Sequence, residues 1–161
     1  MMAFLSGLFA RGEPVLSEAG PPDAAAIAAL HGKSFHRGWS DGEIENMLLD
    51  RAVLAHRAML SGSLVGFILS RVVVDEAEIL SVAVSNARRG KGLARRLLDL
   101  HLRRLAGLGA RAVFLEVGED NVPARRLYGR AGFREVGRRD AYYGGAGSKA
   151  TSALVLRRDL P

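Results

Sequence analysis

The sequence contains no cysteine among its 161 residues. This absence excludes disulfide bonds, a thiolate nucleophile and metal held by cysteine. Any acyl transfer by the chain must therefore proceed without a cysteinyl intermediate. A chain without disulfides also fits a reducing compartment, and we expect a cytoplasmic protein.

Apolar runs of membrane length are absent as well. The apolar stretch at residues 3–10 is too short to span a bilayer, and no basic residues precede it as in a secretory signal. We find no repeat, low-complexity tract or linker between domains. The sequence therefore predicts a loosely ordered extension over residues 1–13, a single domain over residues 14–161 and no membrane partner.

The excess of positive charge predicts an affinity for anions. Lys and Arg number 23 against 17 Asp and Glu, a net charge of +6. Many of the arginines fall in pairs, but there is no basic tail, and few aromatic residues are interleaved with them. We therefore expect no specific nucleic-acid partner, although a non-catalytic domain that binds RNA or another anion stays open as an alternative.

Hydrophobic periodicity predicts a mixed α/β sheet covered by helices. Ser40 and Glu43 have the spacing of a capping box at the start of a short helix. The other predicted helices cover residues 24–35 and 93–108 and a segment capped by Asn121. The predicted strands cover residues 14–19, 52–59, 64–74, 78–84, 112–117, 133–142 and 150–156.

The turn between strand 78–84 and helix 93–108 has the features of an anion site. Gly90 and Gly92 allow a ligand to approach the backbone closely, and the first N–H groups of the helix lack partners. The segment is neither a P-loop nor a dinucleotide fingerprint. A plain strand-to-helix turn with surface arginines is the alternative. The segment matches the Arg/Gln-x-x-Gly-x-Gly/Ala motif of GNAT acetyltransferases, with Arg89, Gly92 and Ala94 at the fixed positions.

This resemblance implies the GNAT fold, a mixed and mostly antiparallel central sheet flanked by helices, and acetyl-CoA as cosubstrate. In the family the turn holds the pyrophosphate of coenzyme A, and the preceding strand pairs with the pantetheine arm. An asparagine after the next strand also contacts the cofactor. The residues implied here are Val82, Ala83, Val84, Arg89, Gly90, Lys91, Gly92, Ala94, Arg95 and Asn121.

A second segment carries a carboxylate and a phenol. Glu116 interrupts an apolar strand, and Tyr128 lies on the helix that follows. An amine must lose a proton before it attacks a thioester, and the departing thiolate gains from a nearby acid, so this pair suits acetyl transfer. Alternatively, Glu116 is an exposed carboxylate at a strand end and Tyr128 is a half-buried helix residue. A helix cap at Asn121 is compatible with both interpretations.

The pattern Leu-Glu-Val, Asn-x-x-Ala, Leu-Tyr and Gly-Phe over residues 115–133 resembles the RimI-type ribosomal-protein-alanine N-acetyltransferases. The resemblance extends over about residues 14–160. It implies that Glu116 is the general base, that Tyr128 is the acid, and that the acceptor is the N-terminal alanine of a small-subunit ribosomal protein. Acceptors that carry another amine, in a small molecule or a lysine side chain, remain open because the fold serves them all.

Three aromatic residues are implied near the acceptor peptide. Trp39 matches the family's Trp-Ser segment, although a place in the core suits it equally, and Tyr142 and Tyr143 match its Asn-Tyr-Tyr. Here Ala141 replaces the asparagine, which leaves peptide specificity open. The four histidines lack metal-ligand spacing, so we expect no metal.

Overall fold

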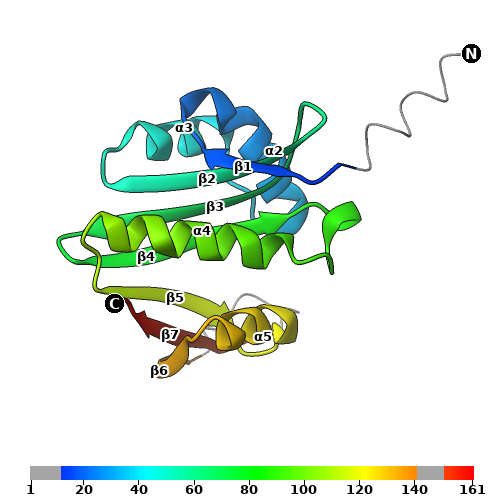
Figure 1. The fold of residues 1–161 in the computed structure, drawn as a ribbon. Helices are drawn as coiled ribbons and strands as arrows, with labels where there is room; N and C mark the ends of the chain where they lie inside the picture. Colours follow the sequence, from blue (N-terminus) through cyan, green and yellow to red (C-terminus); the bar gives the residue numbers. More distant parts are fainter. Residues whose placement is uncertain (1–11, 141–150) are drawn as a thin grey trace, which may run out of the picture.

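The computed structural model describes residues 12–140 and 151–161. Over these residues the chain forms one seven-stranded sheet in the order β1-β2-β3-β4-β5-β7-β6. The strands are β1 Val15–Glu18, β2 Val53–Leu60, β3 Ser63–Val73, β4 Glu76–Val84, β5 Ala112–Gly118, β6 Arg134–Arg139 and β7 Ala153–Asp159. The helices are α2 Ala24–Ser34, α3 Asp41–Leu49, α4 Leu93–Gly107 and α5 Val122–Arg130, with short 3-10 helices η1 Pro21–Asp23 and η2 Asn86–Arg88. The predicted mixed, mostly antiparallel sheet with flanking helices is confirmed (Figure 1).

The core is divided by the sheet, and β3 shows how. Ile68 packs into a cluster with α4 and α5, while Phe67 and Leu69 pack into a second cluster with α2 and α3. Successive side chains of a strand point to opposite faces, so one buried strand serves both clusters. The helices α4 and α5 therefore cover one face, and α2 and α3 cover the other.

A buried polar chain runs through the α4 side of this core. The Nδ1 atoms of His56 and His101 lie 2.7 Å apart, and His101 Nε2 lies 2.6 Å from Ser70 Oγ. All three side chains are buried. In such a short contact one ring nitrogen carries the proton and the other accepts it. Burial lowers the pKa of both rings, so the histidines pack as a neutral pair.

Local signals account for the element boundaries. Ser40 Oγ accepts a hydrogen bond from Glu43 N at 3.1 Å, and Glu43 Oε2 accepts one from Ser40 N at 2.7 Å, which confirms the capping box at α3. Gly132, with φ of 89°, follows α5 as predicted. Pro123 lies in the first turn of that helix, where a missing N–H breaks no helical hydrogen bond.

Four predicted strand ends were wrong by two residues or more. Strand β6 ends at Arg139 rather than at residue 142, and β7 begins at Ala153 rather than at residue 150. Strand β4 begins at Glu76 rather than at residue 78, because Val74, with φ of 59°, completes the preceding turn earlier than expected. Strand β7 continues to Asp159 rather than ending at residue 156. Its charged end is held because Arg157 lies 5.1 Å from the centre of the Phe114 ring and Arg158 donates to Ala131 O at 2.6 Å.

The sheet opens between β4 and β5. These two parallel strands pair only at Glu76 with Ala112, Ala77 with Val113, and Glu78 with Phe114. Beyond these pairs, β4 stays bonded to β3 and β5 stays bonded to β7, and a register shift against β3 marks β4 at this point. Figure 1 shows the two strands diverging toward their C-terminal ends, where α4 and α5 begin.

Candidate active site

The turn after β4 has the conformation that its glycines predict. Gly90 has φ of 74°, and Gly92, the N-cap of α4, has φ of 80°. Both values lie in the left-handed region that L side chains avoid. A Cβ placed on either residue would meet nothing within 4 Å. The glycines therefore serve the backbone path and leave open space beside it, and the first N–H groups of α4 lie at that opening.

The basic side chains of the turn differ in their hydrogen bonds, ion pairs and exposure to solvent. Arg89 Nε donates to Val84 O at 3.2 Å, which ties the turn back to the end of β4. Arg95 forms an ion pair with Asp99 at 2.9 Å, one helical turn away. Lys91 is exposed at the tip of the turn, and Ala94 is half-buried in the first turn of α4. The turn thus combines backbone donors with positive charge.

Val82, Ala83 and Val84 form the end of β4, where they pair with Ile68, Phe67 and Gly66 of β3. Their edge toward β5 is unpaired by that strand within the described residues. Such an edge offers N–H and C=O groups to an extended ligand.

One more residue of β4 is notable at the same point. Ser81 Oγ is buried and has no hydrogen-bond partner in the part of the chain that the structure describes. Ser81 is paired with Leu69 and so faces the α2 and α3 side of the sheet. A buried hydroxyl without a partner is uncommon in a protein core, and here it lies where the register of β4 against β3 shifts.

Glu116 and Tyr128 lie on opposite sides of β5. Leu115 and Val117 are buried in the cluster that contains Tyr128, so Glu116, between them, faces away from it. The carboxylate is on the face that α2 and α3 cover elsewhere, and the hydrophobic cluster that the described residues form beneath these helices contains no residue of β5. The phenol lies beneath α5 on the other face. The two predicted catalytic groups therefore flank the strand that borders the opening, one from each side.

Tyr128 is buried, with 8% of its surface exposed, and its ring meets that of Phe133 edge-on at 5.5 Å. Burial raises the pKa of its hydroxyl to about 12. The phenol therefore remains protonated over the whole neutral range and can act as a proton donor.

Glu116 has an ion-pair partner that no sequence motif indicated. Arg139 Nη2, from the edge strand β6, lies 2.9 Å from Glu116 Oε1. The Glu116 side chain is 38% exposed and that of Arg139 is 60% exposed. The contact crosses β7, so it joins residues that are neighbours neither in sequence nor in strand pairing.

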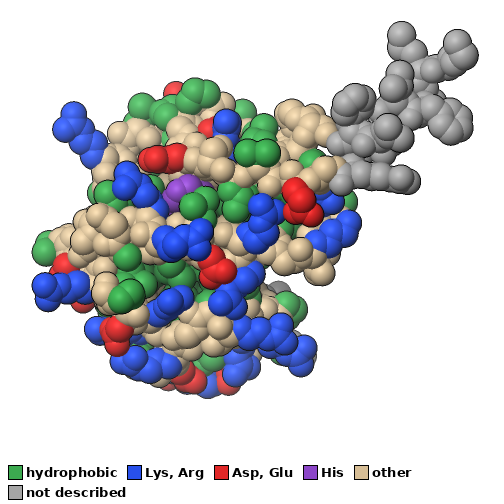
Figure 2. All heavy atoms as spheres, in the orientation of Figure 1, with side chains coloured by type: hydrophobic (Ala, Val, Ile, Leu, Met, Phe, Trp, Pro, Cys, Tyr) green, Lys and Arg blue, Asp and Glu red, His purple; other side chains and the backbone are tan. Residues whose placement is uncertain are grey.

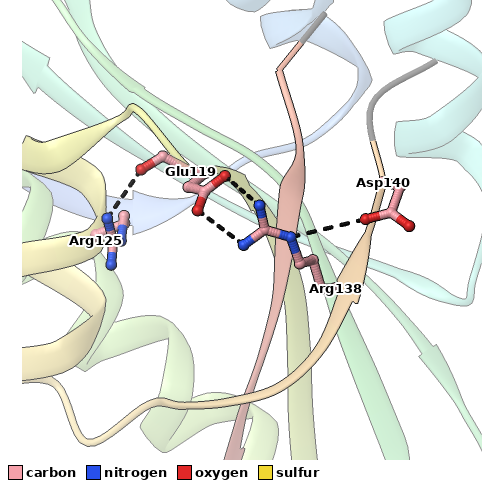
Figure 3. A network of polar contacts seen from close by, with 4 residues as sticks. All are labelled: Glu119, Arg125, Arg138 and Asp140. Carbon is pink, nitrogen blue, oxygen red and sulfur yellow. Dashed lines mark hydrogen bonds and ion pairs between the residues drawn. The ribbon is translucent and has the colours of Figure 1, made fainter.

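A second ion pair braces the segment between β5 and α5 (Figure 3). Both terminal nitrogens of Arg138 donate to the Glu119 carboxylate, at 2.8 and 2.7 Å. Arg125, in the first turn of α5, donates to the carbonyl oxygen of Glu119 at 2.9 Å. Asn121 Oδ1 accepts from Ala124 N at 3.3 Å, which confirms the predicted helix cap, and the cap is compatible with the cofactor contact that the resemblance implies. These contacts fix the start of the helix that carries Tyr128.

The aromatic residues predicted near the acceptor are only partly described. Trp39 is half-buried and stacks on His31, with ring centres 4.3 Å apart, and its backbone N–H donates to His31 Nδ1 at 3.1 Å. Burial lowers the pKa of His31, so the neutral ring accepts this bond. Trp39 therefore packs against the α2 and α3 cluster, as its alternative interpretation states. Tyr142 and Tyr143 lie outside the described residues.

Positive charge is spread over the face formed by α4 and α5 (Figure 2). The arginines of these two helices are Arg95, Arg96, Arg103, Arg104, Arg125, Arg126 and Arg130.

A hollow of about 530 Å³ on another side is lined by α2, the β2–β3 turn and the start of the turn that includes Arg89. Within residues 12–140 and 151–161, no three His, Asp or Glu side chains gather as metal ligands. No helix of the same residues is both long and apolar enough to cross a membrane.

Comparisons with known proteins agree with this geometry. Residues 24–133 match the acetyltransferase (GNAT) family. The [ribosomal protein bS18]-alanine N-acetyltransferase of Haemophilus influenzae is 31% identical over 118 residues, which cover 73% of this chain and 80% of that protein. The mycothiol acetyltransferase of Mycobacteroides abscessus is 31% identical over 140 residues, 79% of this chain but 47% of that protein. The crystal structure of the ribosomal-protein-S18-alanine N-acetyltransferase from Escherichia coli superimposes with a TM-score of 0.83 at 25% identity, over 91% of this chain and 93% of that one. The chain belongs to the GNAT family of acetyltransferases.

Proposed function

We propose that the protein transfers the acetyl group of acetyl-CoA directly to a protein N-terminal amine, that of an N-terminal alanine in a small-subunit ribosomal protein. The observation that carries this proposal is the placement of Glu116 and Tyr128 on opposite faces of β5, beside the opening that β4 and β5 leave. The acceptor is inferred from the relatives named for ribosomal-protein alanine acetylation.

The residues around the opening fit the acyl donor. The turn at Gly90 to Gly92 offers backbone donors and the charges of Arg89 and Lys91 to a diphosphate. The unpaired edge of β4 at residues 82–84 suits the amide groups of an extended pantetheine arm. Acetyl-CoA supplies an activated thioester at this place.

The acceptor approaches from the face of Glu116. An α-amino group has a pKa near 8, so it is largely protonated at neutral pH and needs a base. We assign that role to Glu116, which takes a proton from the amine directly or through water. As the new N–C bond forms and the C–S bond breaks, Tyr128 donates its proton to the sulfur, and the second proton that the nitrogen loses on becoming an amide passes through solvent to restore the phenol. The pKa of Tyr128, about 12, keeps the phenolic proton available.

Short peptides that differ only in their first residue, incubated with acetyl-CoA, test the acceptor. We expect thiol release and acetylated product for Ala-first peptides well above the others. Equal rates for all first residues would remove the alanine assignment while leaving N-terminal acetylation intact.

Two variants test the catalytic pair. We expect Glu116→Gln to lower kcat about 100-fold at neutral pH and Tyr128→Phe to lower it by a similar factor, with the Kd for coenzyme A unchanged. Glu135→Gln, which alters an exposed glutamate of β6, is the matched control and should retain full activity. Activity equal to that of the parent between about pH 6 and pH 9 would refute the role of the residue concerned.

A small-molecule amine is the second candidate acceptor, favoured by the similarity to mycothiol acetyltransferase. Adding polyamines, aminoglycosides and lysine-containing peptides to the peptide panel separates the two. Calorimetry separates both from a binding domain without activity. Such a domain should prefer RNA to coenzyme A and lose affinity steeply as salt rises.

A further inference from the structure

We infer that Arg139 is a positioning residue for Glu116, which it holds in the orientation that the base needs. This inference rests on the proposed function, because it gives Glu116 the role of base. Its starting point is the ion pair between Arg139 Nη2 and Glu116 Oε1 at 2.9 Å.

The register of the three C-terminal strands explains how so distant a pair can meet. Glu116 lies opposite Val155 of β7, which lies opposite Gly137 of β6. One row further on, Gly118 lies opposite Ala153, which lies opposite Arg139. All these residues share one face of the sheet because each row is two residues from the next.

The small residues of these rows let the long arginine lie across the sheet. No side chain rises from Gly118 and Gly137, and Ala153 contributes only a methyl group. The guanidinium of Arg139 can therefore pass over β7 and reach Glu116 diagonally. A Cβ on Gly137 would lie 3.5 Å from Val155 Cβ, which is an ordinary van der Waals contact.

The neighbouring arginine is engaged elsewhere. Arg138 points to the opposite face, since adjacent residues of a strand alternate, and it is held by both oxygens of Glu119 (Figure 3). Arg139 is thus the ion-pair partner that the described residues give to Glu116. The two arginines differ in role, since one braces the start of α5 and the other holds the carboxylate.

Holding the carboxylate matters because Glu116 is otherwise unrestrained. It is 38% exposed, and Arg157, the other arginine nearby on the same face of the sheet, is held by Asp159 and lies over the Phe114 ring, so without Arg139 the carboxylate would sample several rotamers. A base must lie within hydrogen-bonding distance of the proton it takes. A carboxylate can keep one oxygen on the guanidinium while the other accepts the proton.

The test is a double-mutant cycle between Arg139→Gln and Glu116→Gln, measured as kcat and as KM for acetyl-CoA. In the parent background we expect Arg139→Gln to lower kcat about tenfold without changing this KM, since small displacements of a catalytic group cost up to ~10²-fold. Arg139→Lys should recover part of the loss. In the Glu116→Gln background, Arg139→Gln should change kcat by less than about twofold.

Arg134→Gln is the matched control. Arg134 is at the opposite end of the same strand, is 61% exposed, and forms an exposed ion pair with Asp159 at 3.3 Å. We expect Arg134→Gln to leave kcat unchanged. Circular dichroism and thermal midpoints of all variants report whether each is folded.

Three outcomes would overturn the inference. Arg139→Gln could be as active as Arg134→Gln, or it could lose the same factor in the Glu116→Gln background, which would indicate a role that does not pass through Glu116. In both cases an active parent leaves the proposed function standing. A parent that releases no thiol with any amine would remove the proposed function and, with it, the inference.

Discussion

His101 lies fully buried between His56 and Ser70, and this position sets a pH limit on the folded state. Burial first, and then the charge that His56 could carry, lower the pKa of His101 from 6.5 to about 3. Burial also lowers the pKa of His56, against the opposing influence of Glu18. At pH values somewhat below 6.5, both rings are therefore neutral in the folded protein, whereas they are charged in the unfolded chain.

The sign of the effect follows from this difference. Below about pH 6.5 the unfolded chain binds a proton at His101 that the folded protein does not bind. The contribution of the neutral ring to stability is therefore complete above that pH and falls as the pH decreases toward the pKa of His101 in the folded protein. For His101 alone, the free energy of unfolding should drop by about 2 kcal/mol at pH 5. Urea denaturation of the parent at several pH values measures the drop.

The exposed His36 supplies the control for this experiment. His36→Gln should keep the full acid loss of stability, whereas His101→Gln should flatten the pH dependence even if it lowers stability throughout. A free energy of unfolding that is constant between about pH 7.5 and pH 5 would contradict the neutral pair.

Single residues also show which parts of the candidate site could be predicted from the sequence. Glu116, Tyr128 and the glycines of the turn are fixed by short-range spacing, and the sequence alone could propose them. Arg139 could not be proposed, because its contact with Glu116 depends on the order β5-β7-β6 and on the register across β7. The only signal was a pair of arginines at the end of a strand, which alternation sends to opposite faces.

At the scale of elements, the turn and α4 form the unit that we propose holds the diphosphate. Gly92 has φ of 80° at the N-cap, whereas Gly107, the last residue of α4, has no positive φ. A Cβ added to either glycine would meet no atom within 4 Å. The two positions therefore differ in backbone conformation and not in available space.

The comparison of Gly92→Ala with Gly107→Ala uses this difference. Gly92→Ala should cost about 1–2 kcal/mol of stability and weaken coenzyme A binding, since alanine resists the left-handed conformation. Gly107→Ala should be neutral or stabilise by up to about 1 kcal/mol, with binding unchanged. Thermal denaturation and calorimetry with coenzyme A provide both measurements, and equal effects of the two substitutions would argue against a conformational role for Gly92.

Most elements were predictable because each carries its own signal. The capping box at α3, Asn121 before α5 and Gly132 after it are local, and all are confirmed. The end of β7 was predicted wrongly because charged residues there are held by tertiary contacts, the stacking of Arg157 on Phe114 among them. Hydrophobic pattern cannot report such contacts.

At the scale of the whole molecule, the sheet is continuous where β4 and β5 begin and divided where they end. Strands β4 and β5 share three residue pairs and then diverge. Beyond these pairs, among the described strands, β4 is hydrogen-bonded to β3 alone and β5 to β7 alone, so each strand has one unpaired edge that faces the opening. The two groups of strands stay together through the side-chain cluster beneath α4 and α5. A ligand seated between the strands would complete hydrogen bonds that the protein leaves unmade.

Hydrogen exchange tests this view of the molecule. Coenzyme A should slow amide exchange at residues 82–84 of β4, at residues 115–118 of β5 and in the first turn of α4. Exchange in β1 and β2, which lie at the far edge of the sheet, should change little. Uniform slowing throughout the sheet would indicate only the general stabilisation that any bound ligand gives, about 2.7 kcal/mol at a concentration 100 times Kd.

The positions of the ends of the described chain determine where a tag, dye or surface tether is best attached. Arg88 donates to Gly12 O at 2.9 Å, and Arg96 donates to Pro14 O at 3.3 Å, so the start of the described chain is fastened beside the turn and the beginning of α4. The other end is anchored where β5 begins, with Leu160 N donating to Arg111 O at 2.8 Å (Figure 1). A purification tag, dye or surface tether joined through Pro161 therefore sits at the opposite end of the sheet from the opening.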